Sequence, residues 1–166
     1  MDRFKKYADK ILYFPVAIRS EDYNWNKNDD TTQATSWEVE NFQRNHISKA
    51  LELFDSEDAV IIGDLDEIPN KHNLKFFINY LTENPAIALE QRMQICNLEK
   101  QKGLWVGSII TKCSIAISVS PQHCRDQRWH MKRLLNGGWH LSWWGEAAHI
   151  QEKLMSYAHQ ELNTQE

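Results

Sequence analysis

The most restrictive feature of the sequence is the stretch 59–69, in which a β-branched apolar run is followed at once by three carboxylates. The run 59–63 predicts a strand, and its continuous apolar character is typical of a strand buried on both faces of a parallel α/β sheet. Ligands of open α/β sheets bind at the carboxyl ends of strands, which is where Asp64, Asp66 and Glu67 fall. Asp64 and Asp66 are two residues apart, so extended backbone would place them on one side of the chain.

Three adjacent carboxylates repel one another unless something positive neutralises them. A divalent cation would do so, and hard oxygen ligands suit Mg²⁺ or Mn²⁺, the ions that bridge an enzyme to a diphosphate. The structural alternative is a turn whose aspartates cap the following helix. The pattern favours the metal or diphosphate interpretation and does not exclude the helix-capping turn.

The chain of 166 residues is long enough for one domain with its own core, and we expect a single domain over residues 1–166. Its net charge of −4 gives no basic field, so nucleic acid is not an expected partner. The three cysteines lack a metal-binding spacing and indicate a reducing compartment. No stretch resembles a signal peptide or a membrane span, which predicts a cytoplasmic protein and leaves peripheral membrane association open.

Hydrophobic periodicity predicts helices and strands in alternation around the acidic stretch, as in a layered α/β fold. Thr35 and Glu38 fit a capping box at the start of a helix over 36–54. The remaining predicted elements are strand-like 11–17, an exposed loop over 20–36, a helix over 73–81, strands over 87–98 and 114–119, a short helix over 121–128, a turn leading into an aromatic strand over 134–144, and a closing helix over 147–162.

Two enzyme classes place an Asp-x-Asp after a hydrophobic strand. In haloacid-dehalogenase-like (HAD-like) phosphohydrolases the first aspartate is a nucleophile and the loop continues with Gly and then Thr or Val, whereas this sequence has Glu67 and Ile68. In nucleotide-sugar glycosyltransferases the acids hold Mn²⁺ or Mg²⁺ against the donor diphosphate, and the metal acts as a Lewis acid on the leaving group. The second class fits better, and the phosphohydrolase is kept as an alternative.

Residues 63–69, Gly-Asp-Leu-Asp-Glu-Ile-Pro, resemble the Asp-Val-Asp-Glu-Ile-Pro signature of glycosyltransferase family 17, the family of β-1,4-mannosyl-glycoprotein 4-β-N-acetylglucosaminyltransferase. Other segments are similar to the family in the same order along the chain. They are Trp37-x6-Arg44-x2-Ile47, Leu89-Glu90-Gln91, Cys96-Asn97-Leu98, Trp105-x-Gly107, Gly137-Gly138-Trp139-His140-Leu141-Ser142 and Lys153-Leu154-x-Ser156-x-Ala158-His159-x-Glu161-x-Asn163.

The resemblance implies an α/β, GT-A-like (nucleotide-diphospho-sugar transferase) fold with a mixed sheet flanked by helices. It also implies metal-dependent, inverting transfer of N-acetylglucosamine from UDP-GlcNAc to a sugar hydroxyl of a glycan acceptor. Family members carry an additional first strand and acidic loop before the counterpart of Met1, so we expect a chain that is N-terminally truncated relative to the family and lacks the first strand. An inactive or partner-dependent carbohydrate-binding remnant is therefore a further alternative.

The resemblance also implies roles for the acidic loop. Asp66 is the expected ligand of Mn²⁺ or Mg²⁺, with Asp64 as its helper, and a late histidine, His159 or His140, completes the metal sphere. Inversion requires a base that takes the proton of the acceptor hydroxyl, and Glu67 and Glu146 are the candidates.

The other site candidates are expected to bind donor or acceptor. They are Arg44, Trp105, Trp139, His140 and Lys153. Each has a structural alternative: the arginine and the lysine could neutralise Glu67, and the histidine could be a core residue. Strand alternation puts Trp139 and Trp143 on one face and Trp144 on the other. Trp105 follows the glycine-containing turn and is expected to face solvent.

Overall fold

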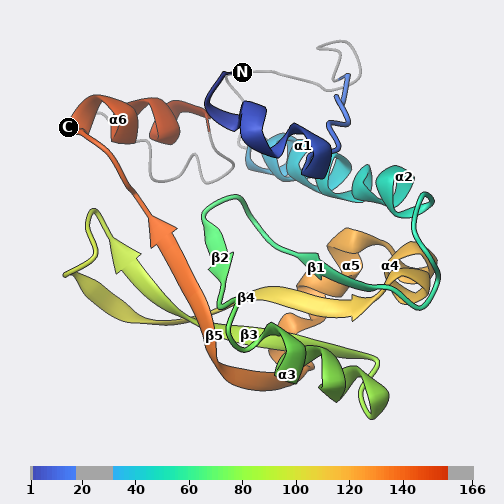
Figure 1. Ribbon diagram of the computed structural model, residues 1–166. Coiled ribbons are helices and arrows are strands. Elements are labelled where there is room, and N and C mark those ends of the chain that lie inside the picture. Colours follow the sequence, from blue (N-terminus) through green and yellow to red (C-terminus); the bar gives the residue numbers. More distant parts are fainter. Residues whose placement is uncertain (1, 18–31, 157–166) are drawn as a thin grey trace.

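The computed structural model describes residues 2–17 and 32–156, and the loop prediction for 20–36 lies largely outside these ranges. A five-stranded sheet forms the centre of the molecule (Figure 1). Its strands are β1 (Ala59–Ile62), β2 (Glu67–Pro69), β3 (Ala86–Ile95), β4 (Gln101–Lys112) and β5 (Lys132–Ser142), in the order β1-β4-β3-β5-β2. The β3–β5 pair is parallel and the other three pairs are antiparallel. The sheet is mixed and flanked by helices, which confirms the predicted α/β class and is consistent with a glycosyltransferase-like fold.

The helices connect and cover these strands. They are η1 (Asp2–Lys10), α1 (Thr32–Asn45), α2 (Ile47–Leu51), α3 (Leu74–Asn79), η3 (Tyr80–Thr82), α4 (Cys113–Val119), α5 (Pro121–Asp126), η4 (Gln127–His130) and α6 (Ala147–Ser156). In Figure 1, α1 and α6 lie above the sheet and α3 lies at its lower end. None of the helices in the described ranges is long and apolar enough to cross a membrane.

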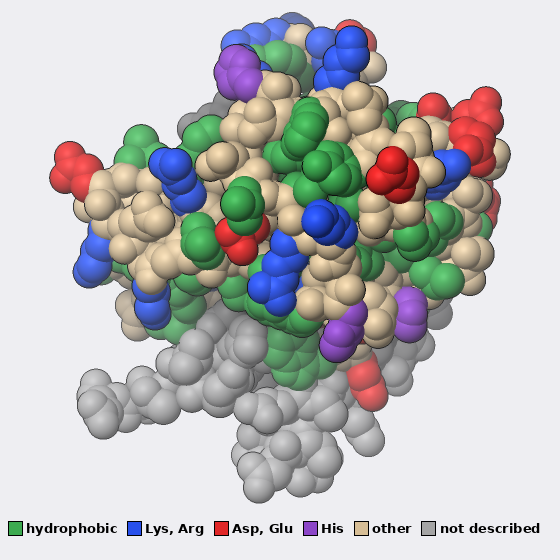
Figure 2. Space-filling model, turned by 90° about the horizontal axis from the view of Figure 1, so that it is seen from below, with side chains coloured by type: hydrophobic (Ala, Val, Ile, Leu, Met, Phe, Trp, Pro, Cys, Tyr) green, Lys and Arg blue, Asp and Glu red, His purple; other side chains and the backbone are tan. Residues whose placement is uncertain are grey.

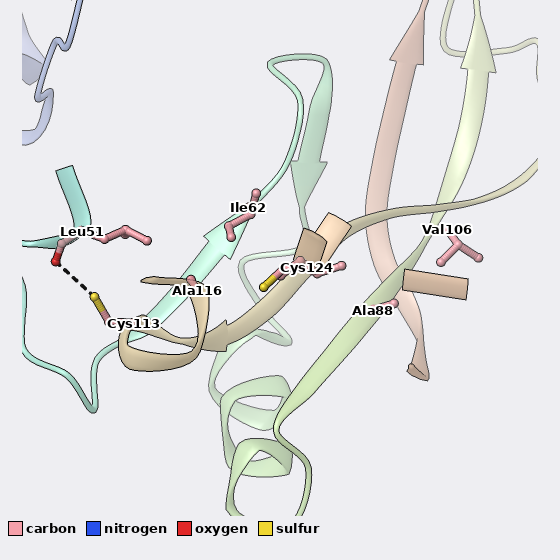
Figure 3. Close-up of a cluster of buried hydrophobic side chains, with 8 residues drawn as sticks. Leu51, Ile62, Ala88, Val106, Cys113, Ala116 and Cys124 are labelled. Atoms are coloured by element: carbon pink, nitrogen blue, oxygen red, sulfur yellow. Dashed lines mark hydrogen bonds between the residues drawn. The ribbon is translucent and has the colours of Figure 1, made fainter. Parts of the chain in front are cut away.

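Hydrophobic side chains form two buried clusters, one on each face of the sheet. On one face, side chains of α2, α4 and α5 pack against Ala88, Val106 and Ile109, as Figure 3 shows in part, and Cys113 Sγ donates a hydrogen bond of 3.2 Å to the carbonyl of Leu51. On the other face, α3 and η3 pack against the strands. That second cluster consists of Phe77, Leu81, Ile87, Leu89, Ile110 and Leu134. Burial of apolar surface on both faces makes the sheet a rigid platform.

The prediction that 59–63 is a parallel strand buried on both faces is wrong. β1 is an edge strand that pairs antiparallel with β4. Only one of its faces is covered, since Ile62 is 2% exposed whereas Ile61 is 40% exposed. A short apolar run does not by itself reveal whether one face or two will be covered.

The remaining differences involve short segments of ambiguous periodicity. The segment 114–119 is helical in α4 rather than a strand, although it contains three β-branched residues, and 11–17 forms no strand. The helix predicted for 36–54 is divided at His46 into α1 and α2. The expected turn in 134–144 is a bulge inside one continuous strand, β5. The helices near 73–81, 121–128 and 147–162 and the strand near 87–98 are present with shorter bounds, α6 being described as far as Ser156.

Three register shifts interrupt the pairing of the inner strands, one of them near the β3–β4 turn at Met93 and Gln94 and two nearer the site. β4 has one extra residue near Gly107 and Ser108, where it pairs with β3. β5 has its irregularity near Asn136, whose φ of 56° lies in the left-handed region that asparagine tolerates. Bulges redirect side chains that simple alternation would place elsewhere, and the one near Gly107 aims Ser108 at the acidic loop.

Candidate functional site

The acidic loop joins β1 to β2, the two outer strands of the sheet, so it carries the chain from one edge to the other. Its last acid, Glu67, is the first residue of β2 and pairs with His140 on β5. A hydrogen bond of 3.0 Å from the Glu67 amide to the Asp64 carbonyl closes the turn between them. The loop is thereby fixed at both ends by strands of a single sheet.

The Glu67 side chain is fully buried and ion-paired. Arg125 binds it in a bidentate manner, with Nη1 2.7 Å from Oε2 and Nη2 2.6 Å from Oε1. Trp105 Nε1 donates to Oε1 at 2.8 Å, and Ser108 Oγ donates to Oε2 at 3.0 Å. Burying a carboxylate is costly unless it is paired and hydrogen-bonded, and here both oxygens meet that condition.

Two glycines leave room for this carboxylate. A Cβ on Gly107 would collide with the Gln91 side chain and lie 2.9 Å from Glu67 Oε1. A Cβ on Gly63 would collide with Ser108 Oγ and lie 3.0 Å from Glu67 Oε2. The carboxylate therefore lies against backbone that has to be free of side chains.

Asp64 is held by two arginines from different helices. Arg44 on α1 places Nη2 2.8 Å from Oδ1, and Arg125 on α5 places Nη2 2.6 Å from Oδ2. Arg44 also binds Glu40, at 2.8 Å, and Gln122. Burial alone would lower the pKa of the Arg125 guanidinium, but its bonds to Glu67 and Asp64 outweigh burial and hold that pKa above its usual range. The arginines thus clamp α1 and α5 onto the loop.

Asp66 has more open surroundings, because its side chain is 28% exposed. Lys153 Nζ on α6 lies 3.0 Å from Oδ2, and His140 Nε2 lies 3.6 Å from Oδ1. Burial raises the pKa of Asp66, but the hydrogen bonds and charges of His140 and Lys153 outweigh burial and lower it to about 2. His140 Nδ1 is buried without a hydrogen-bond partner in the described part of the chain, and its ring centroid lies 4.9 Å from that of Trp105. Asp66 is therefore ionised at any ordinary pH and faces the solvent in part.

These contacts change the interpretation of several predicted site residues. Glu67 was a candidate base, but both its oxygens hold buried donors, so the geometry argues against that role. Asp64 was a candidate metal ligand, but both its oxygens bind arginines. The structural alternative for Arg44 was an ion pair with Glu67. Arg44 does form ion pairs at the loop, but with Asp64 and Glu40. Trp105 is half-buried and tied to Glu67, so the expectation that it faces solvent is wrong.

The other candidates are distributed more widely. Lys153 lies beside Asp66, and Glu146 is exposed just before α6. Trp139 and His140 are neighbours on β5 and project to opposite faces of the sheet, so they do not share one pocket. His159 lies outside the described residues.

The arrangement meets the requirements of a divalent cation only in part. No three His, Cys, Asp or Glu side chains in the described ranges are grouped so that they could hold a metal ion. Asp66 and His140 are a pair of the oxygen and nitrogen type that suits Mn²⁺. The repulsion among the three acids, which motivated the metal, is already relieved by Arg44, Arg125 and Lys153. Asp66 with His140 is thus the part of the loop where a cation would fit.

Arg125 and Ser108 are the site residues that sequence reasoning missed. Arg125 lies 58 residues after Glu67, in a short helix with no distinctive motif. Three adjacent acids in the sequence indicate that positive charge must lie nearby. They do not indicate which lysine or arginine of the chain supplies it. Ser108 reaches the loop because of a bulge that no local pattern announces.

Comparison with known proteins adds the family. The profile of glycosyltransferase family 17 matches residues 1–165. No curated protein and no solved structure gave a significant match. The profile match covers nearly the whole sequence, including the clamped acidic loop and the strand that carries His140, and the chain therefore belongs to glycosyltransferase family 17.

Proposed function

We propose that this glycosyltransferase transfers N-acetylglucosamine from UDP-GlcNAc to a sugar hydroxyl of a glycan acceptor, with inversion at the anomeric carbon. The observation that carries the proposal is Asp66, an ionised and partly exposed carboxylate at the tip of a loop that two arginines hold rigid. A reactive group is most effective when the surrounding contacts fix its position. The family supports sugar transfer, and the choice of donor is our inference.

Lys153 and His140 are the groups that we assign to the donor. Lys153 Nζ lies beside Asp66 on the exposed side of the loop, so an ammonium stands where a diphosphate oxygen would need positive charge. His140 Nε2 lies 3.6 Å from Asp66 Oδ1, so this ring nitrogen, and not the buried Nδ1, is the one that we assign to a ligand beside Asp66. Trp105 supports the imidazole ring from one side.

A divalent cation is part of the proposal, with Asp66 and His140 as the residues that would hold it. When bound, Mn²⁺ or Mg²⁺ would supply charge stabilisation to the departing diphosphate. The clamp formed by Arg44, Arg125 and Glu67 keeps Asp66 in place whether or not the ion is present.

Glu146 is the carboxylate that we assign as the base. Glu146 immediately precedes α6 and lies seven residues before Lys153, and its carbonyl accepts a hydrogen bond from the Ile150 amide in the first turn of the helix. The separation along the helix axis is roughly 10 Å. Glu146 is exposed at the start of the helix whose Lys153 contacts Asp66, and an exposed carboxylate is able to receive a proton.

Hydrolysis and transfer assays with UDP-GlcNAc test the proposal. With Mn²⁺ present we expect turnover of UDP-GlcNAc that falls roughly 100-fold in Asp66→Asn. Asp55→Asn is the matched control, because Asp55 is an exposed acid in another turn, and its turnover should be unchanged.

The assay also separates the alternatives. If UDP-GlcNAc is neither bound nor turned over, the proposal fails for this chain. Binding without turnover would favour the inactive or partner-dependent carbohydrate-binding alternative. Release of phosphate from a generic aryl phosphate, lost in Asp64→Asn, would favour the phosphohydrolase instead.

The base has its own test. Glu146→Gln should lower kcat of transfer with little change in the KM for the donor, and it should flatten the acidic limb of the pH–rate profile. Glu99→Gln, an exposed acid in the turn between β3 and β4, is the matched control. An unchanged pH–rate profile in Glu146→Gln would remove Glu146 from the mechanism.

A further inference from the structure

A groove on the sheet face that carries α3 is separate from the acidic loop. It consists of two adjoining hollows of about 280 Å³ and about 470 Å³. The first is lined by Asn70, Asn73, Arg92, Asn136, Gly138 and Trp139. The second shares Asn73 and Asn136 with it and continues along β5 to Lys132. Lys132 and Trp139 pair with Ile87 and Arg92 on β3, which are five residues apart, so the groove extends for roughly 17 Å at the usual rise of a strand.

Strand register places this groove on the opposite face from Asp66. Glu67 pairs with His140, and both side chains belong to the acidic site. The next pair along the same two strands is Ile68 with Trp139, and successive side chains of a strand project to opposite faces. On β3, Arg92 pairs with Trp139 and therefore shares its face. The sheet thus separates the groove from the loop.

The groove differs in charge from the molecule as a whole. The chain has a net charge of −4, yet the described lining of both hollows includes no acidic residue. Arg92 lies at one end of the groove and Lys132 at the other, and neither has an ion-pair partner within residues 2–17 and 32–156. Arg133 also lines the second hollow, but its guanidinium lies over the Trp129 ring. The two unpaired cations make the groove complementary to an anion.

The first hollow includes side chains of the kinds that recognise sugars, whereas the second is lined largely by apolar ones, among them Phe76, Leu134 and Leu135. Trp139 is 37% exposed and offers an apolar ring face to the first hollow. Asn70 and Asn73 each donate a side-chain hydrogen bond of 3.3 Å to the backbone carbonyl of Asn136, which holds these two amides together beside the junction of the hollows. Amides both donate and accept hydrogen bonds, as a row of hydroxyl groups requires. Figure 2 views the molecule from below, the end where α3 lies in Figure 1, and basic, polar and hydrophobic side chains intermingle near its centre with a few acidic ones.

We propose that this groove is a binding site for an anionic oligosaccharide, a sugar chain bearing carboxylate or phosphate groups. Trp139 stacks on a sugar ring, the three asparagines bind hydroxyl groups, and Arg92 and Lys132 bind the acidic substituents. Arginine pairs well with either carboxylate or phosphate, so the common chemistry is the anionic sugar and its source is decided by experiment. The site does not depend on Asp66, and it would serve to hold a glycan while the opposite face carries out transfer.

Calorimetric titration of the full chain with defined saccharides tests the proposal. The probes are trigalacturonate, a 6-phosphorylated mannopentaose, and the uncharged maltotriose and mannopentaose of matching length. We expect one of the acidic probes to bind at least tenfold more tightly than its neutral counterpart. We expect that preference to weaken as salt is raised, because exposed charges are screened.

Variants locate the binding. Trp139→Ala should weaken the acidic probe roughly tenfold, and Arg92→Ala and Lys132→Ala should each reduce the preference over the neutral probe. Trp144→Ala is the matched control, because Trp144 is similarly exposed, at 39%, and lines neither hollow. Asp66→Asn should leave saccharide binding unchanged while it lowers donor turnover roughly 100-fold. Failure of the saccharide site is therefore distinguishable from failure of the proposed transferase activity.

Three results would overturn the proposal. They are equal binding of charged and neutral probes, an acidic-probe affinity that is insensitive to Trp139→Ala, and loss of that affinity in Asp66→Asn. A further probe, decauridylate, identifies a different occupant. If it binds more tightly than every saccharide and loses affinity in Trp139→Ala, the groove is a nucleic-acid site instead.

Discussion

Two carboxylates one residue apart in the same loop have opposite surroundings. Glu67 is fully buried, and Arg125, Trp105 and Ser108 occupy both its oxygens. Asp66 is partly exposed and is approached by Lys153 from a single helix. The loop thus has a buried end that fixes the fold and an open end that is available for chemistry.

The comparison shows how an acidic motif can combine two tasks. Burying an ion pair costs desolvation energy, so the pair fixes the positions of its two side chains without necessarily raising the net stability. Loss of one partner is strongly destabilising, because it leaves an unpaired charge buried. A half-exposed pair costs less to separate, so a ligand can replace one member. The same residue type therefore acts as scaffold or as reactive group according to its burial.

Arg125→Met should produce the largest effect. It leaves the Glu67 carboxylate buried without its cation, and we expect a loss of about 3–5 kcal/mol in the free energy of unfolding, measured with urea. Arg128→Met, three residues later, is the control. Arg128 is half-buried, lies over the Trp105 and Trp129 rings and donates to the carbonyls of Val106 and Arg125, but it has no carboxylate bound to it in the described residues, so about 1 kcal/mol is expected. Equal losses in the two variants would mean that the Glu67 pair has no special role.

Trp105→Phe should come second. It keeps the ring contact with His140 but removes the indole N–H that donates to the buried Glu67 carboxylate, at a cost of about 2 kcal/mol. Trp129→Phe removes an indole at a surface position and should change the free energy of unfolding by less than about 0.5 kcal/mol. If both changes are equally mild, the hydrogen bond to Glu67 contributes nothing measurable.

The third prediction concerns pH and the open end of the loop. The pKa of Asp66 is lowered from 3.8 to about 2 in the folded protein, so its ionised form stabilises the fold above about pH 4. That contribution, up to about 2 kcal/mol, is lost as the pH falls from about 4 to about 2. Urea denaturation of the wild type and of Asp66→Asn should therefore give stabilities that converge over this range. Curves that remain parallel between pH 5 and pH 2 would contradict it.

The smallest effect on stability is expected from Lys153→Met. The Lys153–Asp66 pair is part-exposed and should contribute less than about 1 kcal/mol, as should the exposed Lys112–Glu57 pair in Lys112→Met. The two variants should differ in activity, because we assign only Lys153 to the donor, so Lys153→Met should raise the KM for UDP-GlcNAc. Equal donor kinetics in the two variants would return Lys153 to a purely structural role.

Local patterns in the sequence predicted more of the elements than of their arrangement. The amphipathic spacing of residues 73–81 and the Ser120–Pro121 start of α5 are encoded by neighbours in the chain, and both helices are present. The segment 114–119 misled because β-branched residues favour strands on average, whereas here they form a helix next to α5 in the packed core. Alternation had predicted one shared face for Trp139 and Trp143, but β5 ends at Ser142, and Trp143 has a φ of 57° outside the strand.

The sequence by itself determined that three acids would stand at the end of an apolar strand, and its motifs indicated the family that the profile match then showed. Tertiary structure alone decided which cations meet those acids. Arg44, Arg125 and Lys153 come from three different helices, 20, 58 and 87 residues away from their partners. The physical reason is that periodicity and capping act over a few residues, whereas an ion pair between distant segments depends on how the whole sheet is assembled. The tertiary structure also decided how far each acid is buried, so that Glu67 is enclosed and Asp66 remains partly exposed to solvent.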